Sequence, residues 1–293
     1  MPALHDLEQR VVEALGRRDA SSLPIVGMGE VSVALGLTCD GKEWVAKRMA
    51  RATPAQFAHH RQLIDDYIAQ LTAVGLAVVD TRVVGLDDES GTVMAYVVQP
   101  RLDADSIGGA VLKAATPDPE HPLLAAIIGQ LGAVTDRVSF DAQVTNYSWD
   151  GTTATLVDVG TPFMWDANGN SLLDMEPFRQ MVPSLVWGPL RKELYAVIDR
   201  WKTPRNVGID LVANLIREGL DGWIEPAIIA LNASPHMGEP MSRVDAQAIF
   251  DEDLKTFPRV VRLQKLQRLW ATHIRRNGYD FFVNTSYGDA GIS

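Results

Sequence analysis

The spacing of hydrophobic residues over the first hundred positions predicts two helices and two pairs of strands. Leucine and valine recur every three or four positions at the start, whereas later runs alternate with polar residues. Asp40-Gly41 lies between two alternating runs and predicts a tight hairpin turn. Thr53-Pro54 opens the second helical pattern and Gly75 ends it. The expected elements are a helix over 4–18, strands over 25–37 and 42–49, a helix over 54–74, and strands over 77–84 and 92–98.

After Gln99-Pro100 the hydrophobic pattern becomes mainly helical. A short strand pair interrupts it, over 147–149 and 153–157, with Asp150-Gly151 at the turn. A β-rich part followed by an α-rich part predicts an α+β fold with two lobes and a cleft between them. We place the β-rich lobe at 1–100 and the helical lobe at 101–293. The helices expected in the second lobe cover 105–115, 121–137, 175–200, 206–231 and 243–276.

Composition narrows the classes of protein and partner. The chain is 46% hydrophobic and 22% charged, which is typical of a globular domain. Its formal charge of -10 argues against nucleic acid as the main partner, and it suits a cationic substrate or simply solubility. Cys39 is the only cysteine, which excludes an internal disulfide and a cysteine-based zinc site. Since no apolar run reaches about 18 residues, we expect a cytoplasmic protein without a membrane partner.

The first strand pair contains a glycine-rich segment and a lysine. Gly27 and Gly29 precede a strand, whereas a dinucleotide-binding fold requires a helix there. Glycines in a hairpin allow backbone N–H groups to approach phosphate oxygens, but they also ease the twist of a hairpin. Alternation puts Lys47 on the strand antiparallel to this hairpin, on the face opposite Arg48. Its ammonium could therefore reach a phosphate beneath the loop, although an isolated strand lysine is usually a surface residue.

A second group of polar residues surrounds the strand pair at 147–157. The turn at Asp150-Gly151 brings Asn146 and Asp158 to the open end of one small hairpin. Two adjacent oxygen ligands suit Mg²⁺, which completes its shell with phosphates and water. Asp141 lies five residues before Asn146 and could accept a proton from an attacking hydroxyl. Each of these residues alone is also a common turn former, so the prediction depends on their combined spacing.

The order of these motifs resembles the protein-kinase-like superfamily, including aminoglycoside phosphotransferase-type enzymes, over about residues 23–163. The resemblance implies ATP and Mg²⁺ as cofactors and Asp141 as the catalytic aspartate. It implies that Lys47 holds the α- and β-phosphates beneath the glycine hairpin. Gly160 would be the hinge after the metal-binding aspartate, and the backbone at Gln99-Pro100 would receive adenine. The residues implied for the nucleotide and metal are Gly27, Gly29, Lys47 and Gln99, with Asn146 and Asp158 as the magnesium ligands.

Several positions depart from the pattern of protein kinases. Ser139-Phe140 precedes the aspartate implied as catalytic, where His-Arg or His-Gly is usual, and Gln143 replaces the lysine common in protein kinases. No Ala-Pro-Glu motif follows, which argues against a conventional Ser/Thr or Tyr protein kinase. Asp65 is the acid that we expect to pair with Lys47, with His60 or Gln56 as substitutes.

The preferred function is therefore transfer of the γ-phosphoryl group of ATP to a hydroxyl of a small molecule. A pseudokinase or scaffold without turnover and an atypical protein kinase are the alternatives. Two further patterns are open to more than one interpretation. Asp210, Asn214 and Glu218 share one helix face that could line a substrate pocket, but a solvated face is favoured. His59-His60 is interpreted as a surface pair.

Overall fold

The computed structural model describes residues 2–17, 19–28 and 32–273. Its N-terminal part contains an antiparallel sheet of five strands in the order β1-β2-β3-β6-β5. Asp40 and Gly41 both have positive φ, 52° and 71°, which is the geometry of the tight turn expected between β2 and β3. The strands are β1 (Ile25–Met28), β2 (Val33–Cys39), β3 (Lys42–Ala52), β5 (Arg82–Asp87) and β6 (Val93–Pro100).

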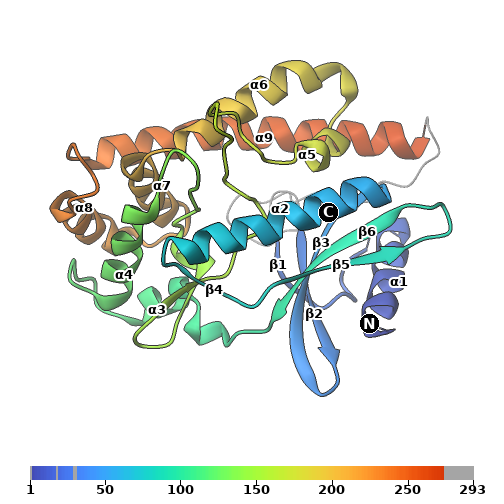
Figure 1. Ribbon diagram of the computed structural model, residues 1–293, viewed down its shortest axis with the longest axis horizontal. Coiled ribbons are helices and arrows are strands. Elements are labelled where there is room, and N and C mark those ends of the chain that lie inside the picture. Colours follow the sequence, from blue (N-terminus) through green and yellow to red (C-terminus); the bar gives the residue numbers. More distant parts are fainter. Residues whose placement is uncertain (1, 18, 29–31, 274–293) are drawn as a thin grey trace.

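A helix covers each face of this sheet. The apolar side of α1 (Pro2–Arg17) packs with Leu35, Ala46 and Tyr96, whereas α2 (Pro54–Ala73) packs with Val83 and Val97 on the opposite face. Figure 1 shows α2 crossing in front of the sheet and α1 behind its edge. Successive residues of a strand point to opposite faces of its sheet. Lys47 on β3 lies opposite Val97 on β6, and Val97 packs in the cluster beneath α2, so Lys47 is on the face that α2 covers.

A buried ion pair anchors α1 to the sheet. The guanidinium of Arg48 donates from Nε to Glu8 Oε2 and from Nη2 to Glu8 Oε1, both at 2.8 Å. The Tyr96 hydroxyl donates to the same carboxylate at 2.5 Å. Arg48 is almost fully buried, and a bidentate pair of this kind is stabilising only when its remaining groups are bonded as well. Arg48 therefore joins the sheet to α1, on the sheet face opposite Lys47.

The C-terminal part is mainly helical, and two of the long helices expected there, over 175–200 and 206–231, are interrupted. The pattern over 206–231 forms two helices because Gly219, at φ 67°, ends the first. The pattern over 175–200 breaks at Val182-Pro183, where Pro183 precedes the next helix. The helices are α3 (Gly108–Ala114), α4 (Pro122–Gln130), α5 (Glu176–Met181), α6 (Ser184–Arg200), α7 (Pro204–Arg217), α8 (Ile224–Ala233) and α9 (Arg243–His273).

A second, three-stranded sheet lies between the two parts, in the order β4-β8-β7. The run expected as one strand over 77–84 is in fact two: β4 (Ala77–Val78) pairs in parallel with β8 (Ala154–Leu156), and β5 begins only at Arg82. β8 also pairs with β7 (Tyr147–Trp149) in the expected hairpin. This sheet ties the residues that follow α2 to the hairpin that carries the candidate metal ligands.

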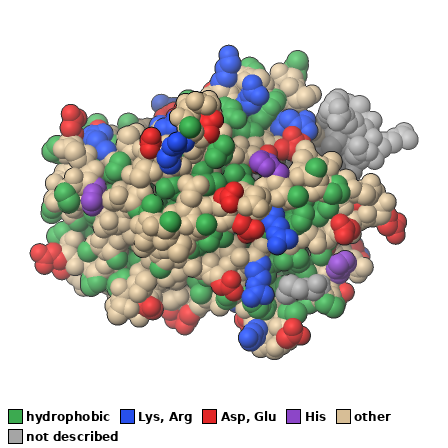
Figure 2. Space-filling model, in the orientation of Figure 1, with side chains coloured by type: hydrophobic (Ala, Val, Ile, Leu, Met, Phe, Trp, Pro, Cys, Tyr) green, Lys and Arg blue, Asp and Glu red, His purple; other side chains and the backbone are tan. Residues whose placement is uncertain are grey.

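These elements form the two-lobed α+β fold that the sequence predicts, with a β-rich N-terminal lobe and a mainly helical C-terminal lobe (Figure 1). On the face drawn in Figure 2, Lys and Arg side chains lie scattered among Asp and Glu. Among the residues that the structure describes, no helix has the length and apolar character needed to cross a membrane.

Candidate active site

Strand register aligns the glycine hairpin with Lys47. Gly27 on β1 lies opposite Ala34 on β2, and Ala34 lies opposite Lys47 on β3. Cross-strand neighbours share a sheet face, so Gly27 and Lys47 lie in one row, roughly 10 Å apart across two strand spacings. Gly29, the second glycine expected over the phosphates, lies outside the described residues. Gly27 and Lys47 thus lie on the same face of the sheet, and a glycine hairpin covering a phosphate stays a prediction.

The ammonium of Lys47 crosses from the β-rich lobe to the helical lobe. Its Nζ lies 3.0 Å from Oδ1 of Asp158, and the two side chains are 15% and 44% exposed. Partial burial by itself would raise the pKa of Asp158, but the Lys47 charge and the Gly160 N–H hold that pKa below its ordinary value. Asp158 is therefore an ionised carboxylate beside a cation, in a partly open position.

Backbone bonds bring Asn146 and Asp158 together, as the hairpin spacing predicts. The N–H of Val157 donates to the carbonyl of Asn146 at 2.7 Å, which closes the open end of the β7–β8 hairpin. At the other end, Asp150 Oδ1 accepts from the N–H groups of Thr152 and Thr153, and Gly151 has φ 97°. The turn thus has the Asx geometry expected from Asp-Gly. Asn146 is thus directly bonded to Val157, the residue before Asp158.

Asp141 lies in the same group. Its Oδ1 accepts from the N–H of Gln143 at 3.0 Å, and the side chain of Asn146 is close enough to lower the pKa of the same carboxyl. Burial raises the pKa of Asp141, and the nearby negative charge of Asp158 adds to this, although the Gln143 N–H and the Asn146 side chain oppose it. A carboxylate with a raised pKa is a stronger proton acceptor than an ordinary aspartate. The geometry therefore groups Lys47, Asp141, Asn146 and Asp158 around one interlobe position.

Two buried side chains hold the segments that carry Asp141 and Asp158 against the β-rich lobe. The hydroxyl of Tyr67 on α2 donates to the carbonyl of Ser139 at 2.8 Å. Nε2 of Gln99 on β6 donates to the carbonyl of Val157 at 2.7 Å and to Thr81 Oγ1 at 3.0 Å. Gln99 lies between the lobes as expected, and its side chain supports the residue before Asp158. Adenine binding at its backbone stays a prediction.

Asp65 does not pair with Lys47. It lies on the exposed side of α2, where its Oδ2 is 3.8 Å from Nε of Arg61, one helical turn away. Lys47 pairs with Asp158 instead. The prediction of Asp65 as the helix acid is therefore wrong, because residue 65 faces solvent while Ile64 and Leu63 face the core. Gln56 is also occupied, since its Oε1 accepts from the N–H of Thr53 in a capping box.

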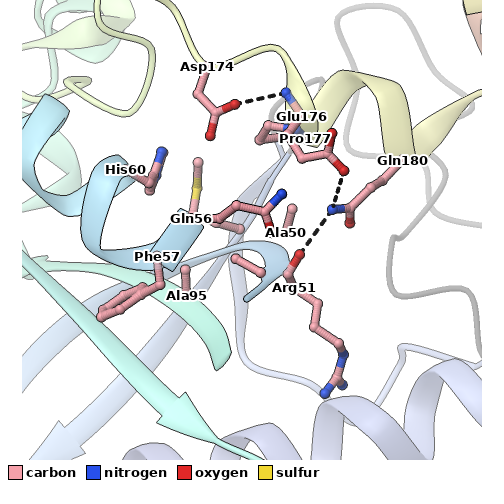
Figure 3. A pocket seen from close by; sticks show the side chains of 12 residues that line it. Ala50, Arg51, Gln56, Phe57, His60, Ala95, Asp174, Glu176, Pro177 and Gln180 are labelled. Carbon is pink, nitrogen blue, oxygen red and sulfur yellow. Dashed lines mark hydrogen bonds between the residues drawn. The ribbon is translucent and has the colours of Figure 1, made fainter. Parts of the chain in front are cut away.

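His60 is the polar α2 residue that does face inward, so its interpretation as a surface residue is wrong. It is only 7% exposed, and neither ring nitrogen has a hydrogen-bond partner among the described residues. Burial lowers the pKa of His60, and the charge of Asp174 opposes this shift. Figure 3 shows His60 and Asp174 among the side chains around a small hollow between α2, β3 and α5. This hollow and the neighbouring one beside Gly160 each have room for about one water molecule, which could bond the ring.

The helix face carrying Asp210, Asn214 and Glu218 turns toward the site rather than toward solvent. Asn214 is almost fully buried and donates from Nδ2 to Asp210 Oδ2 at 3.0 Å. Glu218 accepts from side chains of the loop between Asp141 and Asn146. The preference for a solvated face is thus wrong. The four-residue spacing identifies one face of α7, but it does not say what that face contacts.

Asp210 gives a prediction about stability. Burial, with the negative charge of Asp141 nearby, raises the pKa of Asp210 to about 7. The folded state therefore binds this proton more tightly than the unfolded chain, whose aspartates titrate near 3.9. Ionised Asp210 destabilises the fold above about pH 7, and this effect fades as the pH falls toward 4. We expect Asp210→Asn to raise stability by about 1–3 kcal/mol at pH 8, and by almost nothing near pH 4.

Thermal unfolding of wild type and Asp210→Asn between pH 4 and pH 8 measures this difference. Asp251, an exposed aspartate on α9, provides the matched control Asp251→Asn. A gain in melting temperature for Asp210→Asn that stays constant over the whole pH range would contradict the assignment.

The residues also fit a magnesium ion chemically. Both contacts of Asp158 use Oδ1, and within the described part of the chain no hydrogen bond is found to Oδ2. The side chain of Asn146 carries an amide oxygen, which can serve as a metal ligand. One carboxylate and one amide oxygen match the small number of protein ligands that Mg²⁺ takes when phosphates and water complete its shell.

The solved structures that are similar to this chain include one titled "WaaP in complex with acyl carrier protein". It shares 14% sequence identity with this chain, and the similarity covers 87% of this chain and 92% of that chain with a TM-score of 0.41. No significant match is found among curated proteins. The sequence model described as "Family of unknown function (DUF6206)" matches residues 7–269, and the chain therefore belongs to this family.

Proposed function

We propose that this protein is a phosphotransferase that moves the γ-phosphoryl group of ATP to a hydroxyl of a small molecule, with Mg²⁺ as its cofactor. The observation that carries the proposal is the approach of Lys47 Nζ to within 3.0 Å of Asp158, with Asp141 close enough to Asp158 and Asn146 for both to shift its pKa. Phosphoryl transfer asks a protein mainly to position its substrates and to stabilise charge. An ammonium, two carboxylates and an amide at one interlobe position can do both.

Each residue has a distinct task in this proposal. Lys47 binds the α- and β-phosphates of ATP from the strand beneath the glycine hairpin, where Gly27 allows close backbone approach. Asp141 orients the substrate hydroxyl and takes its proton as the hydroxyl oxygen bonds to the γ-phosphorus of ATP; the bond from that phosphorus to the β–γ bridging oxygen breaks, and ADP leaves with the bonding electron pair. Asn146 and Asp158 would hold Mg²⁺. When bound, the ion would neutralise charge on the phosphate oxygens.

Acidic residues beside Asp141 also suit a positively charged group on the acceptor. Asp210 lies on α7, close enough to Asp141 for the charge of each to affect the other. An amine on the acceptor molecule would be attracted to this pair of carboxylates, so a cationic small molecule is the preferred substrate class. The proposal includes no nucleic acid and no membrane partner, and it places the protein in the cytoplasm.

A thermal-shift titration with ATP, with and without Mg²⁺, tests the nucleotide part of the proposal. A ligand at about 100 times its dissociation constant stabilises the folded state by about 2.7 kcal/mol. For a protein of 293 residues that corresponds to a rise in melting temperature of roughly 4 °C. We expect the rise with MgATP to exceed that with ATP alone. Equal melting temperatures with and without nucleotide would reject ATP binding.

A pseudokinase or scaffold is the second candidate function. The observation that favours it is that, among the described residues, no carboxylate of α2 pairs with Lys47, since Asp65 lies beside Arg61 instead. ATP binding without consumption of ATP, across hydroxyl and amine acceptors, would support this candidate over an enzyme.

A further inference from the structure

The end of α7 holds a carboxylate against the loop that joins Asp141 to Asn146. Oε1 of Glu218 accepts from Gln143 Nε2 and from Thr145 Oγ1, both at 3.0 Å. Gln143 Nε2 also donates to Thr145 Oγ1 at 2.7 Å, so the three side chains form a closed triangle. The loop is therefore attached to α7 at two points by one acceptor atom.

The position of Glu218 is unfavourable for a carboxylate considered alone. Residue 218 caps the C-terminus of α7, where the helix dipole favours positive rather than negative side chains. Burial also raises the pKa of Glu218, against the opposing effect of the hydrogen bonds from Thr145 and Gln143. Lys113 on α3 and Asp141 act on the same carboxylate in opposite directions. The loop contacts are what offset these unfavourable effects, because they bond a group that burial has removed from water.

Gln143 links the Glu218 contact to both Asp141 and Asn146. Its backbone N–H donates to Asp141 Oδ1 at 3.0 Å, and its carbonyl accepts from the backbone N–H of Asn146 at 2.9 Å. The side chain held by Glu218 thus belongs to the residue that orients the Asp141 carboxylate and starts the turn to Asn146. A rotation of Gln143 would displace both groups together.

Close packing of α3 against the loop leaves the loop little room to move. A Cβ atom at Gly108 of α3 would lie 2.3 Å from the carbonyl oxygen of Val144, and one at Gly109 would lie 2.8 Å from Thr145 Cγ2 and 3.3 Å from Glu218 Oε2. Contacts under 3.0 Å do not occur for real Cβ atoms, so these glycines allow the backbone of α3 to lie directly on the loop. The loop therefore packs against α3 as well as against the end of α7.

We propose that Glu218 is a positioning residue, which sets the geometry of Asp141 and Asn146 through Gln143 and Thr145. This role rests on the proposed phosphotransferase function. A displacement of about 1 Å in a catalytic group can lower a rate by about 100-fold. ATP contacts assigned to Lys47 and the glycine hairpin lie in the other lobe and do not depend on Glu218. Loss of the attachment therefore lowers kcat strongly, whereas the KM for MgATP changes only through the displaced metal contact of Asn146.

Two substitutions separate positioning from packing. Glu218→Leu has similar size without an acceptor, and Glu218→Gln keeps an acceptor oxygen. The exposed Glu225 on α8 supplies the control Glu225→Gln. We expect kcat to fall by about 10- to 100-fold in Glu218→Leu with a change in KM for ATP below about threefold, and to recover at least partly in Glu218→Gln. A kcat for Glu218→Leu equal to that of the control overturns the proposal.

Hydrogen exchange of the Asn146 amide supplies a readout that needs neither nucleotide nor substrate. The bond from this amide to Gln143 should open more often in Glu218→Leu, so its exchange should be faster than in wild type and in Glu225→Gln. Unchanged exchange overturns the role of Glu218. Faster exchange in a protein whose wild type consumes no ATP keeps the attachment and rejects the phosphotransferase function, so the two failures are distinguishable.

Discussion

Replacing Asp141 with asparagine is expected to lower ATP turnover by about 100- to 10,000-fold, which is the contribution of a positioned general base. Asparagine keeps an oxygen that can accept from the Gln143 N–H, but it cannot take the proton of an attacking hydroxyl. The loop should therefore keep its geometry while the chemical step slows. ATP consumption with hydroxyl-bearing acceptors, measured at saturating MgATP, gives the ratio of the two rates.

The control for this variant is Asp136→Asn, which changes an exposed aspartate five residues upstream. Asp136→Asn should turn over ATP at the wild-type rate. MgATP should still raise the melting temperature of Asp141→Asn, because the residues assigned to the nucleotide and metal are intact. Wild-type turnover in Asp141→Asn would remove Asp141 from the proposed role and leave the nucleotide site standing.

The raised pKa of Asp141 sets the direction of the pH dependence. A general base must be ionised, so kcat/KM should fall as the pH drops through the pKa of Asp141 in the free enzyme. Because burial raises that pKa, the fall should begin at a higher pH than an ordinary aspartate with a pKa near 3.9 would give.

The sequence predicts those parts of the site that depend on local geometry. Strand alternation places Lys47 opposite Arg48, and the structure has Arg48 on the α1 face with Glu8 while Lys47 reaches Asp158. The Asp-Gly turn brings Asn146 and Asp158 together, because the turn fixes the register in which the two strands pair. Local rules of this kind need no knowledge of the rest of the fold.

The sequence does not predict contacts that depend on how distant elements pack. Helical spacing groups Asp210 with Glu218, but a solvated face and a face buried against a loop have the same spacing. The rotation of α2 decides that His60 faces inward and Asp65 outward, and the pattern of this helix is only weakly one-sided because polar residues interrupt its apolar face. One signal was present: a glutamate at the end of a helix, where the dipole disfavours it, suggests a specific partner.

Replacing Asp158 with alanine is expected to abolish the magnesium-dependent part of ATP binding and to lower turnover by about 1,000-fold or more. The variant removes one of two proposed metal ligands, and a catalytic metal contributes several kcal/mol to transition-state stabilisation. It also leaves the largely buried ammonium of Lys47 without its partner, which is 3.0 Å away in the wild type. The melting temperature without ligand should therefore fall, so the shift on adding ligand is the informative quantity.

Asp158→Asn separates loss of the carboxylate charge from loss of the whole side chain. Asparagine keeps an oxygen for the Gly160 N–H but lacks the charge that attracts a divalent cation and Lys47. Titration of Mg²⁺ at fixed ATP should give no additional thermal shift in either variant, whereas Asp87→Ala, at an exposed aspartate on β5, should match wild type. ATP alone should still stabilise both variants, because Lys47, freed from its pair, remains available for phosphate. A full magnesium-dependent shift in Asp158→Ala would mean that the metal lies elsewhere, and the grouping of Asn146 and Asp158 would then be only a structural feature of the hairpin.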